Sequence, residues 1–185
     1  MLFRSGFRER KDAAAEPVRT GRTAVQRGKQ RNYLGKEHPA GLAERGFLQA
    51  AFTAEEQAAI ATANLSNGKA QGHWTTNGGK DTEDQVFLLS CAEAQKYLGV
   101  SYKNTKNEKP RTSPTDYAIA QGAGTSAVMT DEERPVGIWW LRSPGLNKES
   151  AALVQDGGSL YYRGVTDASV MVRPAILLDL TSDSF

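Results

Sequence analysis

The sequence has few of the side chains that usually carry chemistry, with one cysteine, Cys91, and two histidines among its 185 residues. A single cysteine excludes an internal disulfide and a cysteine-rich zinc site. No apolar run approaches the roughly 20 residues that cross a bilayer, and no apolar segment follows a basic start as in a secretory signal. We therefore expect no membrane span and no signal peptide, and the lone thiol leaves the compartment open.

The remaining reactive groups form no recognisable catalytic or metal-binding pattern. Cys91 falls at the first turn of a predicted helix, where the helix dipole would lower its pKa, but no second cysteine or nearby histidine completes an arrangement. His73 lies in a Gly/Asn/Thr-rich stretch and is interpreted as solvated. The acidic group Asp81, Glu83 and Asp84 lacks the spacing of an EF-hand. We expect no catalytic residue, no metal site and no cofactor.

The net charge of +2 hides an uneven distribution along the chain. Residues 1–46 hold eleven Lys/Arg against five Asp/Glu, whereas the other residues hold twelve against sixteen. A basic segment is therefore joined to an acidic one, and we place a boundary near residue 46, with residues 47–185 as the domain.

Capping residues predict short helices in the first half of this domain. Thr53 with Glu56, and Ser90 with Glu93, have the spacing of a capping box, in which a hydroxyl accepts a helical N–H and the glutamate accepts one in return. Gly99 stands where a left-handed cap would end the second helix. These signals predict one helix after Thr53 and another after Ser90.

A third helix is predicted from Ser113 and Pro114, which resemble a cap and a first helical residue, with Gly122 at its end. From residue 138 onward, apolar and aromatic segments separated by turn signals predict strands. The predicted strand segments are 86–89, 138–142, 152–155, 160–162 and 175–180, with a turn at 156–158. Short helices followed by a strand-rich second half predict an α+β fold.

Two motifs stand out in the second half, WWLRSPG from Trp139 and VRPA from Val172. Adjacent tryptophans on a strand point in opposite directions, so one is expected in the core. The arginines of the two motifs, Arg142 and Arg173, are suited either to binding an anion or to pairing with acidic side chains and strand-end carbonyls. We favour the pairing. The residues assigned to a structural motif are Trp139, Arg142, Pro144, Arg173 and Pro174.

The strings DQVFLLSCAEAQKYLG, SPTDYAIAQG, IWWLRSPG, LVQDGGSLYYRG and VRPAILLDL occur in this order. Over residues 47–180 the sequence resembles a bacterial domain family of unknown function, of the gut Firmicutes type. That family in turn resembles the C-type-lectin-like fold shared by formylglycine-generating enzymes. The resemblance implies an α+β, C-type-lectin-like domain and says little about activity. Since those enzymes hold copper through cysteines, a chain with one cysteine is not expected to be such an oxidase.

Residues 1–46 lack the strings that open similar family members, a strand like LLLSRYGLDALPYN and a segment like TTWERSTLRAWLNG running into FLQAAFT. Codons for residues 32–46, shifted forward by one nucleotide, can spell the second string, and the same shift over residues 12–27 can spell the first. We hypothesise that residues 1–46 are out of frame, that this basic segment is disordered or misplaced, and that the missing strand leaves apolar surface uncovered. The competing interpretation is a genuine basic arm that binds nucleic acid or an anionic surface. Because its charges are dispersed, nucleic acid is the less favoured partner.

We interpret the domain as a non-catalytic binding module for a protein or glycan ligand. Its expected working surface is the loop-rich face with Trp140, Asp156, Tyr161 and Tyr162, because aromatic and short polar loop residues suit recognition. Asp156 also belongs to an Asp-Gly turn signal, which explains it without a ligand. An enzyme of unidentified type and a purely structural domain are the alternatives.

Overall fold

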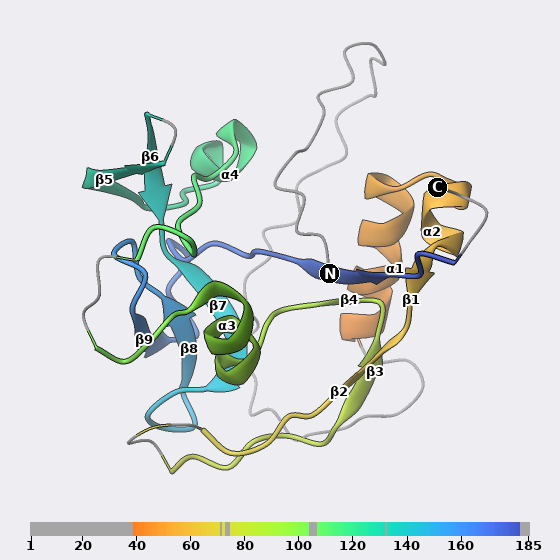
Figure 1. The fold of residues 1–185 in the computed structure, drawn as a ribbon, viewed down its shortest axis with the longest axis horizontal. Coiled ribbons are helices and arrows are strands. Elements are labelled where there is room, and N and C mark those ends of the chain that lie inside the picture. The colour runs from red at the N-terminus through yellow and green to blue at the C-terminus, as the bar shows by residue number, and fades with distance from the viewer. Residues whose placement is uncertain (1–38, 71, 73–74, 104–106, 132, 182–185) are drawn as a thin grey trace.

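The computed structural model describes residues 39–70, 72, 75–103, 107–131 and 133–181 (Figure 1). Short helices precede a strand-rich second half, which confirms the predicted α+β class. The elements are α1 (Pro39–Ala51), α2 (Ala54–Ala58), β1 (Ile60–Ala61), β2 (Ala63–Leu65), β3 (Thr82–Asp84), β4 (Val86–Phe87), α3 (Cys91–Leu98), α4 (Asp116–Ala120), β5 (Thr125–Asp131), β6 (Arg134–Gly137), β7 (Trp139–Pro144), β8 (Ser150–Val154), β9 (Leu160–Gly164) and β10 (Ala175–Leu178).

The predicted out-of-frame segment lies mostly outside the described residues. Its last part belongs to α1, which begins at Pro39 and continues without a break to Ala51. The boundary placed near residue 46 therefore falls inside a helix. That residues 1–46 are translated out of frame stays a prediction.

The strands form antiparallel units at two ends of the molecule. At one end, β7, β8 and β9 pair in that order, and the β5–β6 hairpin lies beyond them with α4 (Figure 1). At the other end, β10 pairs between β1 and β4, close to α1 and α2. The β2–β3 hairpin extends from the second end toward the first. It therefore brings polar residues of the first half of the chain close to the WWLRSPG motif.

The best-packed part of the core lies between α3 and the β7–β8–β9 sheet. Residues of β7 alternate between buried and partly exposed positions, and the buried set begins with Trp139 and Leu141, which are 1% and 2% exposed. Alternate side chains of a strand point to opposite faces, so Trp139 and Leu141 meet this cluster from one face of β7. The cluster also contains Cys91, Ala94, Leu98, Val100, Ala152, Val154 and Leu160.

Local capping signals account for the helix boundaries near the core. Thr53 and Ser90 both form the predicted capping boxes with Glu56 and Glu93. Gly99 takes the left-handed conformation, with φ of 67°, that ends α3. These three predictions are confirmed.

The third helix begins two residues later than predicted. Thr115 is its N-cap, because the Thr115 hydroxyl accepts the N–H of Ala118 at 3.2 Å. The Ser113 hydroxyl is engaged elsewhere and donates to the carbonyl oxygen of Arg134. A contact made across 21 residues thus displaces the cap that local spacing suggested.

Candidate functional site

The residues predicted to form the working surface lie on and beside the β7–β8–β9 sheet. Trp140 pairs with Leu153 of β8, and Leu153 pairs with Tyr161 of β9, so these three residues form one row across the sheet. Tyr161 is 46% exposed, and its ring stacks on that of Tyr162 with centroids 4.9 Å apart. Trp140 is half-buried. The row therefore carries the exposed ring of Tyr161 and the half-buried ring of Trp140 on the two sides of Leu153.

Asp156 lies in the predicted turn between β8 and β9. The N–H of Gly158 donates to the carbonyl oxygen of Gln155, and the N–H of Gly157 donates to the Asp156 carboxylate at 2.9 Å. Gly158 has a φ of 84°, and a Cβ there would overlap with the Asn107 carbonyl oxygen, so only glycine fits. The turn therefore accounts for Asp156.

Trp139 and Arg173 hold the core end of the two motifs together. The guanidinium of Arg173 lies over the Trp139 ring, 4.9 Å from its centroid. Both side chains donate a hydrogen bond to the carbonyl oxygen of Pro110, each at 3.2 Å. Pro174, next in the motif, is exposed. Arg173 is thus engaged by a strand-side carbonyl and an aromatic face, as is common for arginine.

Arg142 joins three parts of the chain at the end of β7. It forms a bidentate ion pair with Glu93 of α3, and one of its two contacts, to Glu93 Oε1, measures 3.0 Å. Its terminal nitrogens also donate to the carbonyl oxygens of Leu88, at 2.9 Å, and of Ser66, at 3.4 Å. The sequence favoured these two kinds of partner. Four terminal N–H groups meet four acceptor contacts, so Arg142 retains no terminal donor for an anion.

Glu93 is held as a carboxylate by its neighbours. Burial alone would raise its pKa, but the hydrogen bonds from Arg142 and from the N–H of Ser90 outweigh that effect and lower the pKa. The Ser90 hydroxyl in turn accepts the N–H of Glu93. The Arg142–Glu93 pair is therefore neutral as a unit and fixed by the helix cap.

A cleft of about 510 Å³ opens beside this ion pair. Its walls come from the β2–β3 hairpin, the first turn of α3 and the end of β7. It is lined by Asn64, Ser66, Asn67, Gly68, Lys69, Gly79, Ser90, Ala92, Glu93, Arg142, Ser143 and Pro144. Five of the twelve lining residues carry an amide or hydroxyl side chain, and Lys69 is the one charge in the lining that has no opposite partner among the described residues.

The hairpin wall of the cleft is held in place by its own loop contacts. Asn67 donates its backbone N–H to the Asp81 carboxylate and its side-chain amide to the carbonyl oxygen of Lys80, at 2.8 and 2.9 Å. A Cβ at Gly78 would overlap with the carbonyl oxygens of Asn67 and Gly68, so the two arms of the loop touch backbone to backbone. The wall is therefore ordered before any ligand arrives.

Two wall residues remain available for binding. The side chains of Asn64 and Ser66 are exposed. Among the residues that the structure describes, neither side chain has a hydrogen-bond partner. An amide and a hydroxyl can each donate and accept, so these groups suit a ligand rich in hydroxyl groups.

Sequence reasoning missed this cleft because no local pattern marks it. Ser66 and Arg142 are separated by 76 residues and Glu93 and Arg142 by 49. The one available signal was the expectation that Arg142 pairs with an acidic side chain or a carbonyl oxygen. The sequence did not indicate which residue provides either group.

Cys91 is a core residue. Its side chain is fully buried, and burial raises the pKa of the thiol despite hydrogen bonds with Ser143 and Tyr102. Desolvation is the largest effect on this pKa, and it acts against the lowering that a position at the start of α3 favours. The backbone N–H of Cys91 donates to the Ser143 hydroxyl, which ties α3 to β7.

The described part of the chain shows no three His, Cys, Asp or Glu side chains grouped as around a metal ion. His73 lies outside the described residues. None of the described helices is long and apolar enough to span a bilayer.

The profile of a domain of unknown function, DUF6273, matches residues 20–180. The chain belongs to this family. The match contains every motif quoted above, and it starts before residue 47, where the resemblance in the sequence was placed. No curated protein and no solved structure shows a significant match to the chain. The function of this DUF6273 domain must therefore be argued from its own geometry.

Proposed function

We propose that this DUF6273 domain is a non-catalytic module that binds a neutral glycan in the cleft beside the Arg142–Glu93 pair. The observation that carries the proposal is the lining of that cleft, in which five hydroxyl and amide side chains accompany the neutral Arg142–Glu93 pair and Lys69 is the one unpaired charge among the described residues. Sugars offer many hydroxyl groups and little charge, and such side chains match them as donors and acceptors. A volume of about 510 Å³ is within the range of small-ligand sites.

Pre-organisation of the cleft supports binding. Asn67 and Gly78 order the hairpin wall, and the capping box of α3 fixes Glu93 on the opposite wall. Fewer side chains then have to be immobilised when the ligand binds, which lowers the entropic cost of association.

The module is proposed to be non-catalytic because of the surroundings of two reactive groups, the Cys91 thiol and the Glu93 carboxylate. The Cys91 thiol is buried with a raised pKa, so it is no nucleophile. The Glu93 carboxylate has a lowered pKa, so it is a poor general acid near neutral pH.

A protein ligand on the aromatic face is the second candidate. The exposed, stacked ring of Tyr161 favours it, because tyrosine is enriched at protein interfaces. This candidate uses the face that the sequence singled out, whereas the first uses the cleft.

The test is a glycan array probed with the full chain and with two variants. The double variant Asn64→Ala/Ser66→Ala removes the free groups of the cleft. We expect its affinity for retained glycans to fall about 30-fold, since two hydrogen bonds of about 1 kcal/mol each are lost. Tyr161→Ala is the matched control on the other face and is expected to bind as the parent does. Loss of binding in Tyr161→Ala alone would move the site to the aromatic face, and retention of no glycan would reject the proposal.

Three finer statements belong to the same proposal. The domain is taken to be bacterial and C-type-lectin-like, on the sequence motifs quoted above. Its first 46 residues are taken to be out of frame, and translating the coding DNA in the neighbouring frame tests this, because stop codons there would reject it.

A further inference from the structure

The hairpin that walls the cleft also borders a second hollow. This hollow has a volume of about 500 Å³ and is lined by Asn64, Leu65, Ser66, Asp81, Thr82 and Glu83. It shares Asn64 and Ser66 with the cleft. The two hollows are therefore neighbours along the β2–β3 hairpin.

We infer that the two hollows form one groove, and that its ligand is a linear oligosaccharide that lies across Asn64 and Ser66 and occupies both. This inference rests on the glycan-binding function proposed above and extends it from one sugar site to two subsites. The cleft beside the Arg142–Glu93 pair is the first subsite, and the hollow beside Glu83 is the second.

Strand geometry explains why the shared residues face the groove. Asn64 lies in β2 and Ser66 follows the end of that strand. Both side chains are exposed and line both hollows, whereas Leu65 between them is 4% exposed and belongs to the core. Asn64 pairs with Glu83 across the hairpin, which places the Glu83 carboxylate next to the shared wall. One face of the hairpin thus runs from the first subsite into the second.

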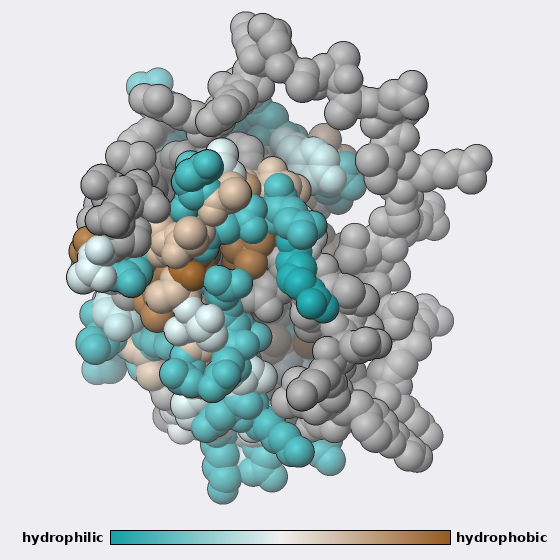
Figure 2. All heavy atoms as spheres, turned by 90° about the vertical axis from the view of Figure 1, so that its right-hand side faces the viewer, coloured by the Kyte–Doolittle hydropathy of each residue, from teal (hydrophilic) through white to brown (hydrophobic). Residues whose placement is uncertain are grey.

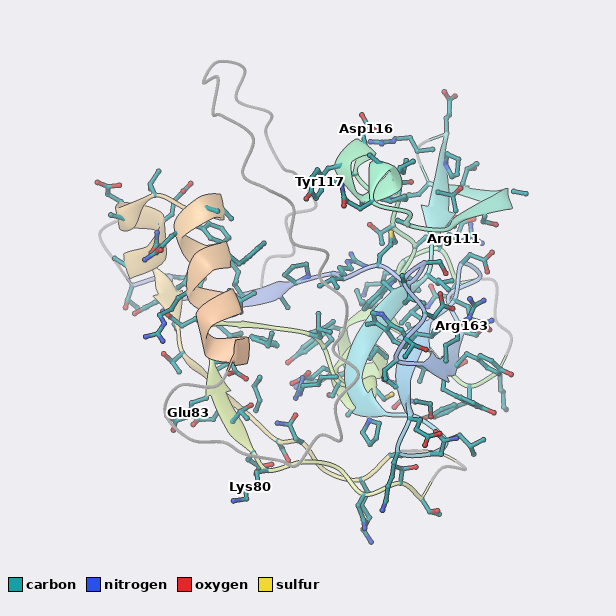
Figure 3. All side chains as sticks on the ribbon, turned by 180° about the vertical axis from the view of Figure 1, so that it is seen from behind. Lys80, Glu83, Arg111, Asp116, Tyr117 and Arg163 are labelled. Carbon is teal, nitrogen blue, oxygen red and sulfur yellow. The ribbon has the colours of Figure 1, made fainter. Side chains whose placement is uncertain are left out.

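The polar groups of the second subsite divide into anchored and free ones. The Asp81 carboxylate accepts the N–H of Asn67, and the Thr82 hydroxyl donates to Asp84 at 2.7 Å. Within the described ranges, the exposed Glu83 carboxylate has no hydrogen-bond or ion-pair partner. Figure 3 shows Glu83 and Lys80 on this hairpin, far from Asp116 and Tyr117 at the other extremity of the molecule. Glu83 is therefore the group of the second subsite that is available to accept hydroxyl hydrogens from a sugar.

The experiment is calorimetric titration of the full chain with the mono- to hexasaccharide ladder of the neutral glycan that the array retains most strongly. We expect affinity to rise with length until both subsites are filled. Glu83→Gln should weaken binding of the longer ligands about three- to tenfold, because the amide oxygen of the variant still accepts a hydrogen bond but carries no charge. It should leave the monosaccharide unaffected. Glu55→Gln, an exposed change on α2 outside the groove, is the matched control.

Each other outcome has a distinct meaning. Equal affinity for the mono- and hexasaccharide, with no effect of Glu83→Gln, overturns the two-subsite groove while glycan binding stands. An equal loss for every length in Glu83→Gln also overturns it, because one site then contains Glu83. No binding to any glycan overturns the proposed function itself.

Discussion

The two ends of the molecule differ in how completely their central strands are covered. In β7, Trp139 and Leu141 are 1% and 2% exposed beneath α3. In β10, the apolar residues from Ile176 to Leu178 are only partly buried, although such runs are typical of strands covered on both faces. Figure 2 looks onto this second end and shows apolar atoms among polar ones. Most of the apolar burial that stabilises the fold therefore lies at the β7 end.

This difference bears on the first 46 residues. If a strand of the family is missing there, apolar surface is expected to remain uncovered. The partly buried run in β10 pairs with β1 and β4, the elements of the less covered end. The candidate groove, by contrast, takes two of its walls from the well-packed end, where Arg142 and Glu93 are fixed.

Matched leucine truncations at the two ends test the comparison most strongly. Leu141→Ala removes a fully buried side chain and is expected to lower the free energy of unfolding by about 2–5 kcal/mol. Leu178→Ala removes a half-buried one and is expected to cost about 1 kcal/mol. Urea denaturation measures both. Equal losses would mean that β10 is as well covered as β7.

The ion pair that joins α3 to β7 has the next largest expected effect. Glu93→Gln removes the charge partner of Arg142, and a hydrogen bond to a charged group contributes about 1.5–3 kcal/mol. Because the two side chains are 13% and 28% exposed, we expect the lower part of that range. Glu108→Gln is the control, since Glu108 pairs with Arg111 while 83% exposed and should change stability little.

The same pair predicts a pH dependence. The pKa of Glu93 is lowered in the folded chain from an ordinary value of 4.5. Its stabilisation is then complete above pH 4.5 and declines as the pH falls through the folded pKa, because protons bind more tightly to the unfolded chain. The stability advantage of the parent over Glu93→Gln should shrink below pH 4.5. An advantage that stays constant to pH 3 would contradict the ion pair.

The features that sequence reasoning predicted are those decided within a few residues. Thr53 and Ser90 cap helices whose glutamates stand three positions later, and the 156–158 turn closes on itself. The α+β class followed from the order of such local signals. None of these predictions depended on tertiary contacts between distant segments.

The features that it missed depend on contacts between distant segments. The strands β2 and β3 have three residues each, too few for a periodic pattern, and they form because they pair with each other. Arg142 finds Ser66 and Glu93 only after folding. The predicted working surface was chosen by residue type, whereas the cleft arises where three separate segments meet.

The last prediction concerns the loop that orders the hairpin wall. Gly78→Ala would place a Cβ against the carbonyl oxygens of Asn67 and Gly68, and backbone atoms cannot move aside cheaply. We expect a loss of about 1–3 kcal/mol, as for overpacked sites, smaller if the loop shifts as a unit. Gly79→Ala is the neighbouring control, because nothing lies within 4 Å of a Cβ there. Since the wall carries Asn64 and Ser66, Gly78→Ala should also weaken glycan binding while Gly79→Ala should not. Equal behaviour of the two variants in unfolding and in titration would show that the loop does not order the wall, and the argument from pre-organisation would then fail.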